Sequence, residues 1–338
     1  MKELGENKPF VSIIIPCRDE GKFIKECINS IIANDYPKER LEILIVDGMS
    51  EDRTREIVKS YIEKYPYIKL LNNSQKYTPF ALNIGIKQAK GEIIMRMDAH
   101  ATYKKDYISK CLKYLNEYKA DNVGGIWITM SKKNTLVGKS IAFALSHPFG
   151  AGNAYYRMGG QQEPKEVDTV PFGCYKKEVF EEIGLFNEHL IRNQDLEFNL
   201  RLRKAGGKIL LAPDIVAYYY PKSNLKDFLK HNFEDAIWVT YPLKFGAKAF
   251  SWRHLVPLIF VSGLIGTGIL GIFFPVFLWL FLNIIILYLL INLYFSLSIA
   301  IKEKNFRYLS SMPIVFLVRH ISYGLGSLWG ITKIYLKK

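Results

Sequence analysis

Mainly apolar residues fall into short continuous blocks over the first part of the chain. Residues 11–15, 41–46 and 93–95 form such blocks, and each has the length of a strand buried on both faces. Between the first two blocks, Ile24, Ile28 and Ile31 recur at helical spacing. Alternating strands and helices at this pitch predict an α/β domain with a mostly parallel sheet covered on both faces.

Capping and loop residues predict where the elements begin and end. Ser50 is a suitable N-cap for a helix with Glu51 and Asp52 in its first turn. A further helix is expected to begin at 78–79 with proline in its first turn and to stop at Gly91. Residues 167–173 predict a later strand. The glycine-rich segment 149–162 predicts a mobile binding loop or a disordered linker.

The pattern changes after residue 221. Residues 223–254 mix Lys, Trp, Tyr and Phe with apolar positions, which predicts amphipathic helices at a membrane interface or packed on the preceding domain. Residues 255–301 carry no charge and suit two membrane spans of about 20 residues, at 255–274 and 276–301. A third apolar segment at 312–336 predicts a span, a re-entrant helix or an interfacial helix. The expected division is therefore a domain at 1–222, interfacial helices at 223–254 and a membrane domain at 255–338.

Basic residues indicate how the first two spans are oriented. They flank the predicted pair on both sides: Arg253 and His254 before it, and Lys302, Lys304 and Arg307 after it. By the positive-inside rule both ends of the pair, and with them the N-terminal domain, are expected in the cytoplasm. Lys333, Lys337 and Lys338 favour the same side. Residues 1–9 are charged, so no signal peptide is expected there.

The formal net charge of +14 points to anionic partners. It suits a protein that lies against an anionic lipid bilayer and handles anionic substrates. No nucleic-acid-binding signature accompanies it, so nucleic acid is not expected as a partner. The four cysteines, at 17, 27, 111 and 174, lack Cys-x-x-Cys spacing and are expected to be reduced thiols.

Candidate site residues stand where three predicted strands end. Pro16, Asp47 and Asp98 occupy these ends, and ligands of parallel sheets bind in the crevice there. Asp98 and His100 would face the same side of an extended strand. A carboxylate with an imidazole suits Mn²⁺ better than Mg²⁺, so this pair predicts a divalent metal site. The alternative is a strand end followed by a polar turn.

A further carboxylate opens a later helix. Asp195 precedes a helical pattern of apolar residues, and the positive end of a helix dipole favours an ionised side chain in its first turn. Such a carboxylate can serve as a general base. Glu197 is the alternative base, and a simple capping role is the alternative for Asp195.

Four motifs in this order resemble one enzyme family. They are the strand 11–16 with its following Glu20, Val46-Asp47-Gly48, residues 81–85 with Lys90-Gly91-Glu92, and residues 97–100. This combination is similar to the inverting family-two glycosyltransferases of the GT-A fold, and most of all to the membrane-bound enzymes that build bacterial exopolysaccharide repeat units. The resemblance covers residues 11–221, with a weaker echo in the membrane segments. It implies a Rossmann-like GT-A catalytic domain.

The resemblance also implies roles for individual residues. Pro16, Arg18 and Glu20 would belong to the first nucleotide-binding loop, Asp47 would read the uracil or ribose edge, and Asn83 would join the same nucleotide-sugar site. The pair Asp98 and His100 would hold the metal and the donor diphosphate, and Asp195 would be the base.

Three positions depart from the family pattern. Gly48 replaces the second Asp of Val-Asp-Asp, His100 replaces the last Asp of Asp-x-Asp, and Gln194 stands where the family often has Glu. The second departure leaves the identity of the metal, and the need for one, open.

The expected function is an integral-membrane inverting glycosyltransferase of polysaccharide or glycan biosynthesis. It would transfer one sugar from a nucleotide-sugar, a UDP-sugar in the first instance, to a polyprenyl-linked acceptor at the cytoplasmic face. Arg319, with His320 beside it, would contact the acceptor's phosphate. The alternative is that Arg319 reaches the lipid headgroups or pairs with a protein carboxylate.

Three other functions are possible on this sequence. A processive polysaccharide synthase would share the fold, but its Gln-x-x-Arg-Trp motif is missing from 231–238. A polyprenyl-phosphate glycosyltransferase would use a simpler acceptor. A non-enzymatic membrane scaffold with a degenerate nucleotide-binding domain is disfavoured by the presence of Asp47, Asp98 and Asp195 together.

Overall fold

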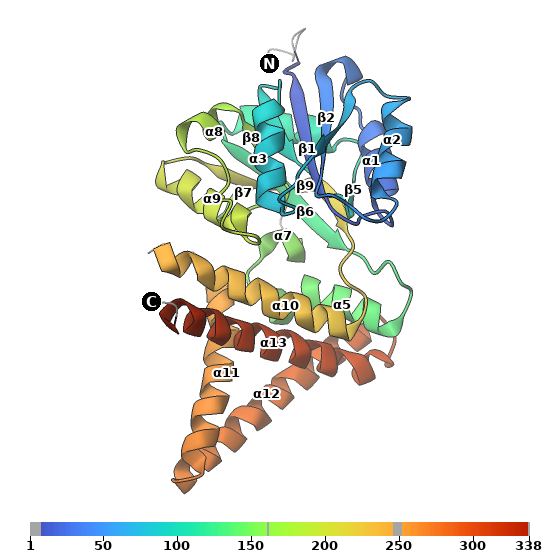
Figure 1. Ribbon diagram of the computed structural model, residues 1–338. Helices are drawn as coiled ribbons and strands as arrows, with labels where there is room; N and C mark the ends of the chain where they lie inside the picture. The colour runs from blue at the N-terminus through green and yellow to red at the C-terminus, as the bar shows by residue number, and fades with distance from the viewer. Residues whose placement is uncertain (1–7, 161, 246–251, 337–338) are drawn as a thin grey trace. The chain divides into compact units, whose positions relative to one another are not determined.

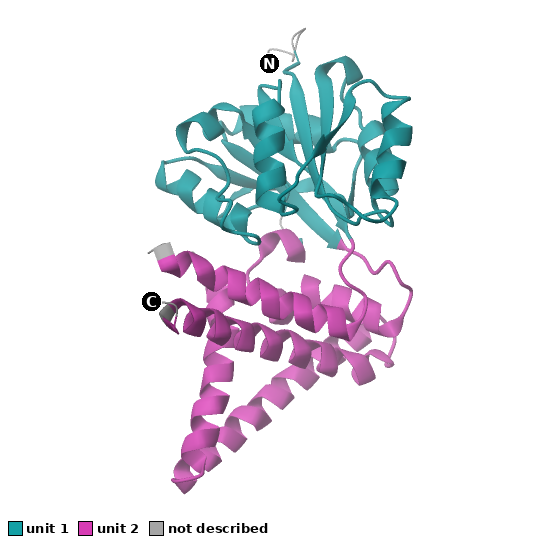
Figure 2. Ribbon diagram, in the orientation of Figure 1, with its two compact units in different colours: residues 1–128, 159–219 teal, residues 129–158, 220–338 magenta. Residues whose placement is uncertain are grey.

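The computed structural model describes residues 8–160, 162–245 and 252–336. The chain forms two compact units (Figure 2). Unit 1 comprises residues 1–128 and 159–219, and unit 2 comprises residues 129–158 and 220–338. The segment 129–158 thus groups with the C-terminal helices, although it interrupts unit 1 in the sequence.

Unit 1 is built on a nine-stranded mixed sheet (Figure 1). The strand order is β3-β2-β1-β4-β8-β6-β9-β5, with β7 paired to β9. Strands β3, β2, β1 and β4 run parallel, and β4 pairs antiparallel with β8. The Rossmann-like α/β sheet predicted from the sequence is confirmed. Its strands are β1 Val11–Cys17, β2 Leu41–Asp47, β3 Ile68–Asn72, β4 Ile93–Arg96, β5 Ala101–Tyr103, β6 Asn122–Thr129, β7 Lys165–Glu166, β8 Cys174–Lys176 and β9 Ile209–Tyr219.

Helices pack on both faces of the parallel strands. The described helices of unit 1 are α1 Ile24–Ile32, η1 Lys38–Arg40, α2 Thr54–Ile62, α3 Thr78–Gln88, α4 Tyr107–Glu117, α8 Glu178–Glu182 and α9 Gln194–Lys204. Ile13 and Ile15 belong to a buried core with residues of α1 and α4. Ile14 points to the other face and meets α3 at Gly85, where a Cβ would lie 2.5 Å from Ile14 Cγ2. Alternate side chains of β1 therefore pack against the helices on the two opposite faces of the sheet.

Two local predictions in unit 1 are wrong. Helix α2 begins at Thr54, and Ser50 does not cap it, because the Ser50 hydroxyl binds Asp47 instead. Residues 167–173 are irregular and β8 begins only at Cys174. Within that stretch Phe172 has a φ of 49°, which interrupts an extended conformation. The helix predicted at 78–79 does begin there, as α3.

Unit 2 is helical. Its elements are α5 Leu136–Ser146, α6 Pro148–Ala151, α7 Tyr155–Met158, α10 Leu225–Thr240, η2 Tyr241–Phe245, α11 Trp252–Gly271, α12 Pro275–Lys302 and α13 Tyr308–Leu336. Helices α10 and α13 lie side by side (Figure 1). A Cβ on Gly326 would lie 2.3 Å from the Phe233 carbonyl oxygen, so α13 approaches α10 backbone to backbone. An apolar core joins α5, α12 and α13 through Ile141, Ile299 and Phe316.

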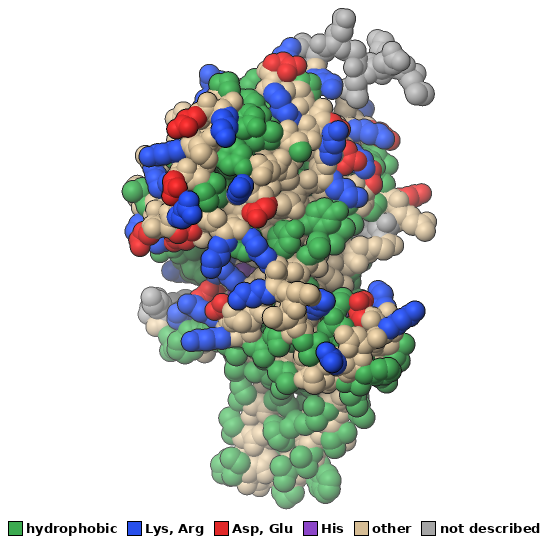
Figure 3. Space-filling view, turned by 90° about the vertical axis from the view of Figure 1, so that its right-hand side faces the viewer, with side chains coloured by type: hydrophobic (Ala, Val, Ile, Leu, Met, Phe, Trp, Pro, Cys, Tyr) green, Lys and Arg blue, Asp and Glu red, His purple; other side chains and the backbone are tan. Residues whose placement is uncertain are grey.

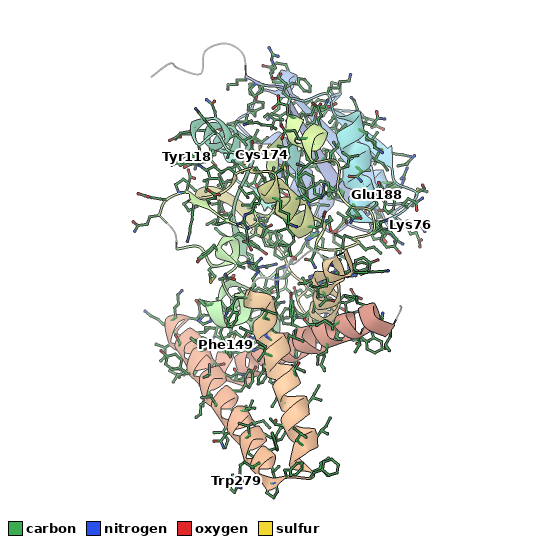
Figure 4. The ribbon with its side chains drawn as sticks, turned by 90° about the vertical axis from the view of Figure 1, so that its left-hand side faces the viewer. Lys76, Tyr118, Phe149, Cys174, Glu188 and Trp279 are labelled. Carbon is green, nitrogen blue, oxygen red and sulfur yellow. The ribbon has the colours of Figure 1, made fainter. Side chains whose placement is uncertain are left out.

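Among the described residues of unit 2, three helices are long and apolar enough to cross a membrane: α11, α12 and α13. In their apolar windows 17% of α11 and 11% of α12 is buried, against 44% of α13. Hydrophobic side chains cover the α11–α12 hairpin in the view of Figure 3, and Trp279 lies near its tip in Figure 4. The predicted apolar helices are thus present, and α13 is the one most enclosed by protein.

The segment 149–162 was predicted as a mobile loop or a linker. Half of it is instead short helix, since α6 and α7 cover residues 149–151 and 155–158. Phe149 (Figure 4) packs its ring 4.9 Å from the rings of both Phe295 and Phe316. Residue 161 lies outside the described residues. These contacts anchor the beginning of the segment in unit 2.

Candidate active site

The loop after β1 is fixed by the loop before α2. The backbone N–H of Asp19 donates to Ser50 Oγ at 2.8 Å, and the N–H of Glu51 donates back to Asp19 Oδ1 at 2.8 Å. The Glu20 N–H likewise donates to Thr54 Oγ1 at 2.8 Å. Asp19 adopts a left-handed φ of 54°, which these bonds hold in place. Two loops that follow neighbouring parallel strands therefore form one rigid rim.

Asp47 is fully buried at the end of β2. Its carboxylate accepts hydrogen bonds from Ser50 Oγ at 2.5 Å and from Arg55 Nη1 at 2.5 Å. Arg55 also donates to Asn72 Oδ1 at 2.9 Å. Arg55 did not emerge from sequence reasoning, although it stands eight residues after Asp47. At this strand end, beside Gly48, Asp47 therefore supplies hydrogen-bond acceptors and Arg55 supplies hydrogen-bond donors.

Asp98 and His100 lie in a turn between β4 and β5. The N–H of Ala101 donates to the Asp98 carbonyl at 3.2 Å, so the extended strand expected for this pair is wrong. Tyr103 Oη accepts a hydrogen bond from the Asp98 N–H at 2.7 Å. His100 Nδ1 lies 3.1 Å from Glu20 Oε1, which joins this turn to the rim. The turn thus brings Glu20, Asp98 and His100 to one edge of the sheet by a different route from the predicted one.

Arg96 is the last residue of β4, and its positively charged guanidinium lies at this edge of the sheet. Its Nε and Nη2 lie 3.0 and 3.3 Å from the two oxygens of Asp98. Its Nη1 lies 3.6 Å from Asp195 Oδ2. Burial lowers the pKa of the Arg96 guanidinium, but Asp98 and Asp195 outweigh that effect and raise it. Sequence reasoning missed Arg96, because nothing in the local pattern shows which carboxylates it meets.

Asp195 lies in the first turn of α9, as the sequence predicted. Its side chain is 34% exposed, so a substrate can reach it. Glu197, the alternative base, is 14% exposed and binds Arg201 through two bonds of 2.7 and 3.1 Å. Arg201 also donates to the carbonyl oxygens of Ile183 and Leu185. The geometry therefore leaves Asp195 accessible and gives Glu197 a structural partner.

Asn83 is buried in α3 and uses its side-chain amide inside the protein. Its Nδ2 donates to the Phe186 carbonyl and to Glu188 Oε1, both at 2.9 Å, and its Oδ1 accepts from the Phe186 N–H at 3.0 Å. These bonds tie α3 to the loop that leads to α9. The structure assigns Asn83 to holding this loop, and contact with a nucleotide-sugar stays a prediction.

The metal site predicted at Asp98 and His100 has few protein ligands. Over the described ranges 8–160, 162–245 and 252–336, no group of three His, Cys, Asp or Glu side chains is placed to hold an ion. Asp98 is paired with Arg96, and His100 with Glu20. A cation that is brought by a diphosphate needs only one or two protein ligands, because phosphate and water supply the others. The residues present fit such a shared site and do not form a protein cage.

Two buried thiols lie behind the site. Cys27 Sγ is 3.5 Å from the Asp98 carbonyl oxygen, and Cys17 Sγ is 3.9 Å from Asp47 Oδ1. Burial, followed by the nearby carboxylates, raises the pKa of both thiols. All four cysteines are free thiols, as expected from their spacing, and all four are buried.

Arg319 and His320 form a separate polar cluster within unit 2. Arg319 donates from Nε to the Gly150 carbonyl at 3.1 Å and from Nη1 to Asn232 Oδ1. His320 Nε2 lies 2.7 Å from the Phe149 carbonyl oxygen, which makes that nitrogen the donor. The two oxygen atoms that Arg319 binds are neutral, and its guanidinium carbon also lies 5.2 Å from the centroid of the Tyr323 ring, so none of these three groups carries a formal negative charge.

Comparison with known proteins defines the family. Residues 12–184 match the model of glycosyl transferase family 2. The chain belongs to this family and is a glycosyltransferase. The resemblance stated from the motifs is confirmed, and with it the enzyme class.

Two relatives cover most of the chain. One is the dolichyl N-acetyl-alpha-D-glucosaminyl phosphate 3-beta-D-2,3-diacetamido-2,3-dideoxy-beta-D-glucuronosyltransferase of Methanococcus voltae. It is 31% identical over 325 residues, which is 93% of this chain and 95% of the relative. The other is the succinoglycan biosynthesis protein ExoA of Rhizobium meliloti. It is 26% identical over 76% of this chain and 84% of its own length.

A solved structure supports the fold over nearly the whole chain. The mannosyltransferase PcManGT from Pyrobaculum calidifontis, solved in complex with GDP-Man and Mn²⁺, covers 96% of this chain and 88% of its own. The TM-score is 0.60 at 19% sequence identity. This similarity shows a shared GT-A fold.

Proposed function

We propose that this protein is an inverting glycosyltransferase that transfers one sugar from a nucleotide-sugar to a polyprenyl-linked acceptor at the cytoplasmic membrane face. The observation that carries the proposal is the cluster of Asp98, Arg96 and the accessible Asp195 at one edge of the sheet. Sequence similarity to an enzyme named for a dolichyl-linked substrate supports the acceptor class. A UDP-sugar is the first donor to test.

Asp195 is the general base in this proposal. It takes the proton of the acceptor hydroxyl as that oxygen attacks the anomeric carbon of the donor sugar. The bond from that carbon to the diphosphate breaks on the opposite side, so the configuration inverts and the nucleoside diphosphate leaves. The first-turn position of Asp195 suits this role, because the helix dipole stabilises a carboxylate there. Glu197 is less suited, since it is bound to Arg201.

The donor would bind along the rim formed by the first loop and Asp47. Pro16, Arg18 and Glu20 would line the nucleotide side of that rim, and Asp47 with Arg55 would meet the base or ribose edge. Arg18 is half-exposed and carries the positive charge needed next to a diphosphate.

Asp98 and His100 would hold a divalent cation together with the donor diphosphate. Such an ion would stabilise the negative charge of the leaving group. Mn²⁺ is preferred over Mg²⁺ because an imidazole nitrogen is part of the ligand set. Glu20, which binds His100, would orient the imidazole ring in the way that carboxylates orient metal-bound histidines.

The membrane segments would bring a lipid acceptor to the soluble donor. We place α11 and α12 across the bilayer as a hairpin with both ends in the cytoplasm, because basic residues flank it on both sides. Helix α13 is more enclosed than the other two, so we place it at the interface instead of across the bilayer. The positive charge of Lys333 favours the cytoplasmic side for this helix, while Lys337 and Lys338 lie outside the described residues.

Arg319 is the candidate contact for the acceptor phosphate. Its guanidinium is bonded to the Gly150 carbonyl and the Asn232 amide, and neither of these oxygens neutralises its charge. Because an arginine donates from five N–H groups, these two partners leave capacity for a phosphate oxygen. His320 would support the site through its bond to the Phe149 carbonyl.

A polyprenyl-phosphate glycosyltransferase is the second candidate function. It would use the same catalytic edge and the same membrane helices, with the lipid phosphate itself as the nucleophile. A phosphate nucleophile needs no general base, so this candidate is disfavoured by the accessible Asp195. A processive synthase is disfavoured by the missing Gln-x-x-Arg-Trp motif at 231–238.

The test is transfer by the full chain in lipid nanodiscs. Each of a panel of UDP-, GDP- and dTDP-sugars is offered with polyprenyl diphosphate-linked and polyprenyl phosphate-linked N-acetylglucosamine, and with the bare polyprenyl phosphate. We expect a single sugar to be added to a saccharide-bearing lipid, with inverted anomeric configuration by NMR. Transfer only to bare polyprenyl phosphate would favour the second candidate, and a retained configuration would exclude the mechanism.

A further inference from the structure

Arg96 stands between two carboxylates that serve different steps of the proposed reaction. Asp98 belongs to the donor side and Asp195 to the acceptor side. The Arg96 side chain is only 12% exposed. Its backbone N–H donates to the Gly173 carbonyl at 3.0 Å, and β4 is paired with β1 and β8. The sheet therefore fixes the point from which the guanidinium extends.

The two edges of this guanidinium are not equally satisfied. The edge with Nε and Nη2 matches both oxygens of Asp98 at 3.0 and 3.3 Å, which is a bidentate pair. On the other edge, Nη1 lies 3.6 Å from Asp195 Oδ2, beyond hydrogen-bond distance. Within the described part of the chain, Nη1 is buried and has no hydrogen-bond partner. A buried N–H without a partner is destabilising relative to one that is bonded, so Nη1 favours any acceptor oxygen that comes within reach.

Arg201 on helix α9 is a useful comparison. Its Nε and Nη2 bind Glu197, and Nη1 and Nη2 also donate to the carbonyl oxygens of Ile183 and Leu185. That arginine is satisfied on both edges, as expected of a structural residue. Arg96 keeps one strong donor directed at the proposed base, and catalytic hydrogen bonds in ligand-free proteins are commonly long and tighten when substrates bind.

Building on the proposed function, we propose that Arg96 is a positioning residue for the transfer reaction. Its bidentate pair fixes the guanidinium on Asp98, and its free Nη1–H orients the carboxylate of Asp195 toward the acceptor hydroxyl. Asp195 Oδ2, the oxygen nearest Nη1, accepts from it, and Oδ1, which already accepts from the Leu196 N–H at 2.9 Å, takes the proton on its remaining lone pair. The donor-side carboxylate and the base are thereby held at a set distance by one planar group.

Arginine is required for this role, and lysine is not equivalent. The guanidinium is planar and offers separate N–H groups to the two carboxylates at fixed angles. A lysine ammonium is a single point charge and cannot keep the bidentate pair with Asp98 while bonding Asp195. Replacement by lysine therefore preserves the charge and removes the geometry.

The test compares Arg96→Ala and Arg96→Lys with the wild type in nanodiscs. Arg53→Met is the matched control, because Arg53, the residue before α2, forms an exposed pair with Glu56 at 3.0 Å. We expect kcat of Arg96→Ala to fall by roughly 10²-fold, the scale of a mispositioned catalytic group, with a smaller change in donor KM. Methylguanidinium should restore part of this rate, and methylammonium at the same concentration should not. The kcat of Arg96→Lys should stay roughly 10-fold or more below that of the wild type. The kcat of Arg53→Met should equal that of the wild type.

Each other outcome has a definite meaning. An Arg96→Ala enzyme with wild-type kcat and a raised donor KM would assign Arg96 to donor binding alone and overturn the proposal. Failure of methylguanidinium to rescue a variant with wild-type melting temperature would also overturn it. If Arg96→Ala does not fold, full activity of Arg96→Lys would overturn it. A wild-type protein inactive on every nucleotide-sugar would instead refute the proposed function, on which this inference depends.

Discussion

Asp195→Asn and Glu197→Gln should separate catalysis from stability on one helix turn. Both substitutions keep the side-chain shape and remove a charge. Asp195 is 34% exposed and its nearest cation is 3.6 Å away, so its loss should cost at most about 1 kcal/mol of unfolding free energy. Glu197 is 14% exposed and has two bonds of 2.7 and 3.1 Å to Arg201. Its loss should cost about 1.5–3 kcal/mol, the range for hydrogen bonds to charged groups.

The effects on turnover should run the other way. Removal of a general base lowers the rate by roughly 10²–10⁴-fold, which corresponds to about 3–5 kcal/mol in the activation free energy. We therefore expect Asp195→Asn to lose turnover with nearly unchanged donor binding, and Glu197→Gln to keep turnover. A melting temperature lower by roughly 2–4 °C per kcal/mol should mark Glu197→Gln.

The assay measures kcat, donor affinity by calorimetry and the melting temperature on the same nanodisc preparations. An active Asp195→Asn together with an inactive, stably folded Glu197→Gln would refute the assignment and move the base to Glu197. Equal loss of activity in both variants, with equal melting temperatures, would show that the charge of the helix turn matters and not the position of one carboxylate.

Three further predictions follow from other contacts. Mn²⁺ should support transfer better than Mg²⁺, and His100→Ala should lose most of the metal-dependent rate; equal rates in EDTA and in Mn²⁺ would reject the metal. Arg319→Ala should raise the KM for the lipid acceptor roughly 10-fold, as for one lost charge-assisted bond, while calorimetry shows unchanged nucleotide-sugar binding. An unchanged acceptor KM would mean that Arg319 only anchors the helix at the membrane. Burial raises the pKa of Glu42, but bonds from the Lys90 N–H, Ser12 and Lys69 outweigh it and lower that pKa. Its stabilisation is therefore present above the unfolded pKa of about 4.3 and is lost as pH falls from there through the lower folded pKa. Between about pH 5 and about pH 2 the melting temperature of Glu42→Gln should fall less than that of the wild type, and an equal fall in both would contradict this.

The parallel strands and their ends could be predicted because their signals are local. A continuous apolar block of this short length favours a buried strand over a helix, and Asp47 follows one directly. The apolar helices of the membrane segment and the first-turn position of Asp195 rest on equally local patterns. Each of these features is decided by residues adjacent in the chain.

The partners of the charged residues could not be predicted, because they are set by chain reversals. Asp98 lies in a turn, so its geometry depends on Tyr103 and on strand β5. Ser50 has the chemistry of an N-cap but turns back to Asp47. Arg96 meets Asp195 only because β4 ends and α9 begins at the same edge of the sheet, although the two residues are 99 positions apart in the sequence. Long-range pairing of this kind leaves no periodic signal.

The membership of residues 129–158 in unit 2 has a consequence for how the chain is made. Helix α5 leaves the ribosome well before α12 and α13, which supply Ile299 and Phe316 to its apolar core. Until those helices are synthesised, Ile141 and Leu145 lack the apolar side chains of α12 and α13 that bury them, and they form an exposed apolar surface that can associate with other chains. A soluble fragment ended at residue 222 would carry that surface permanently. A fragment intended to stay monomeric must therefore also lose or replace residues 129–158.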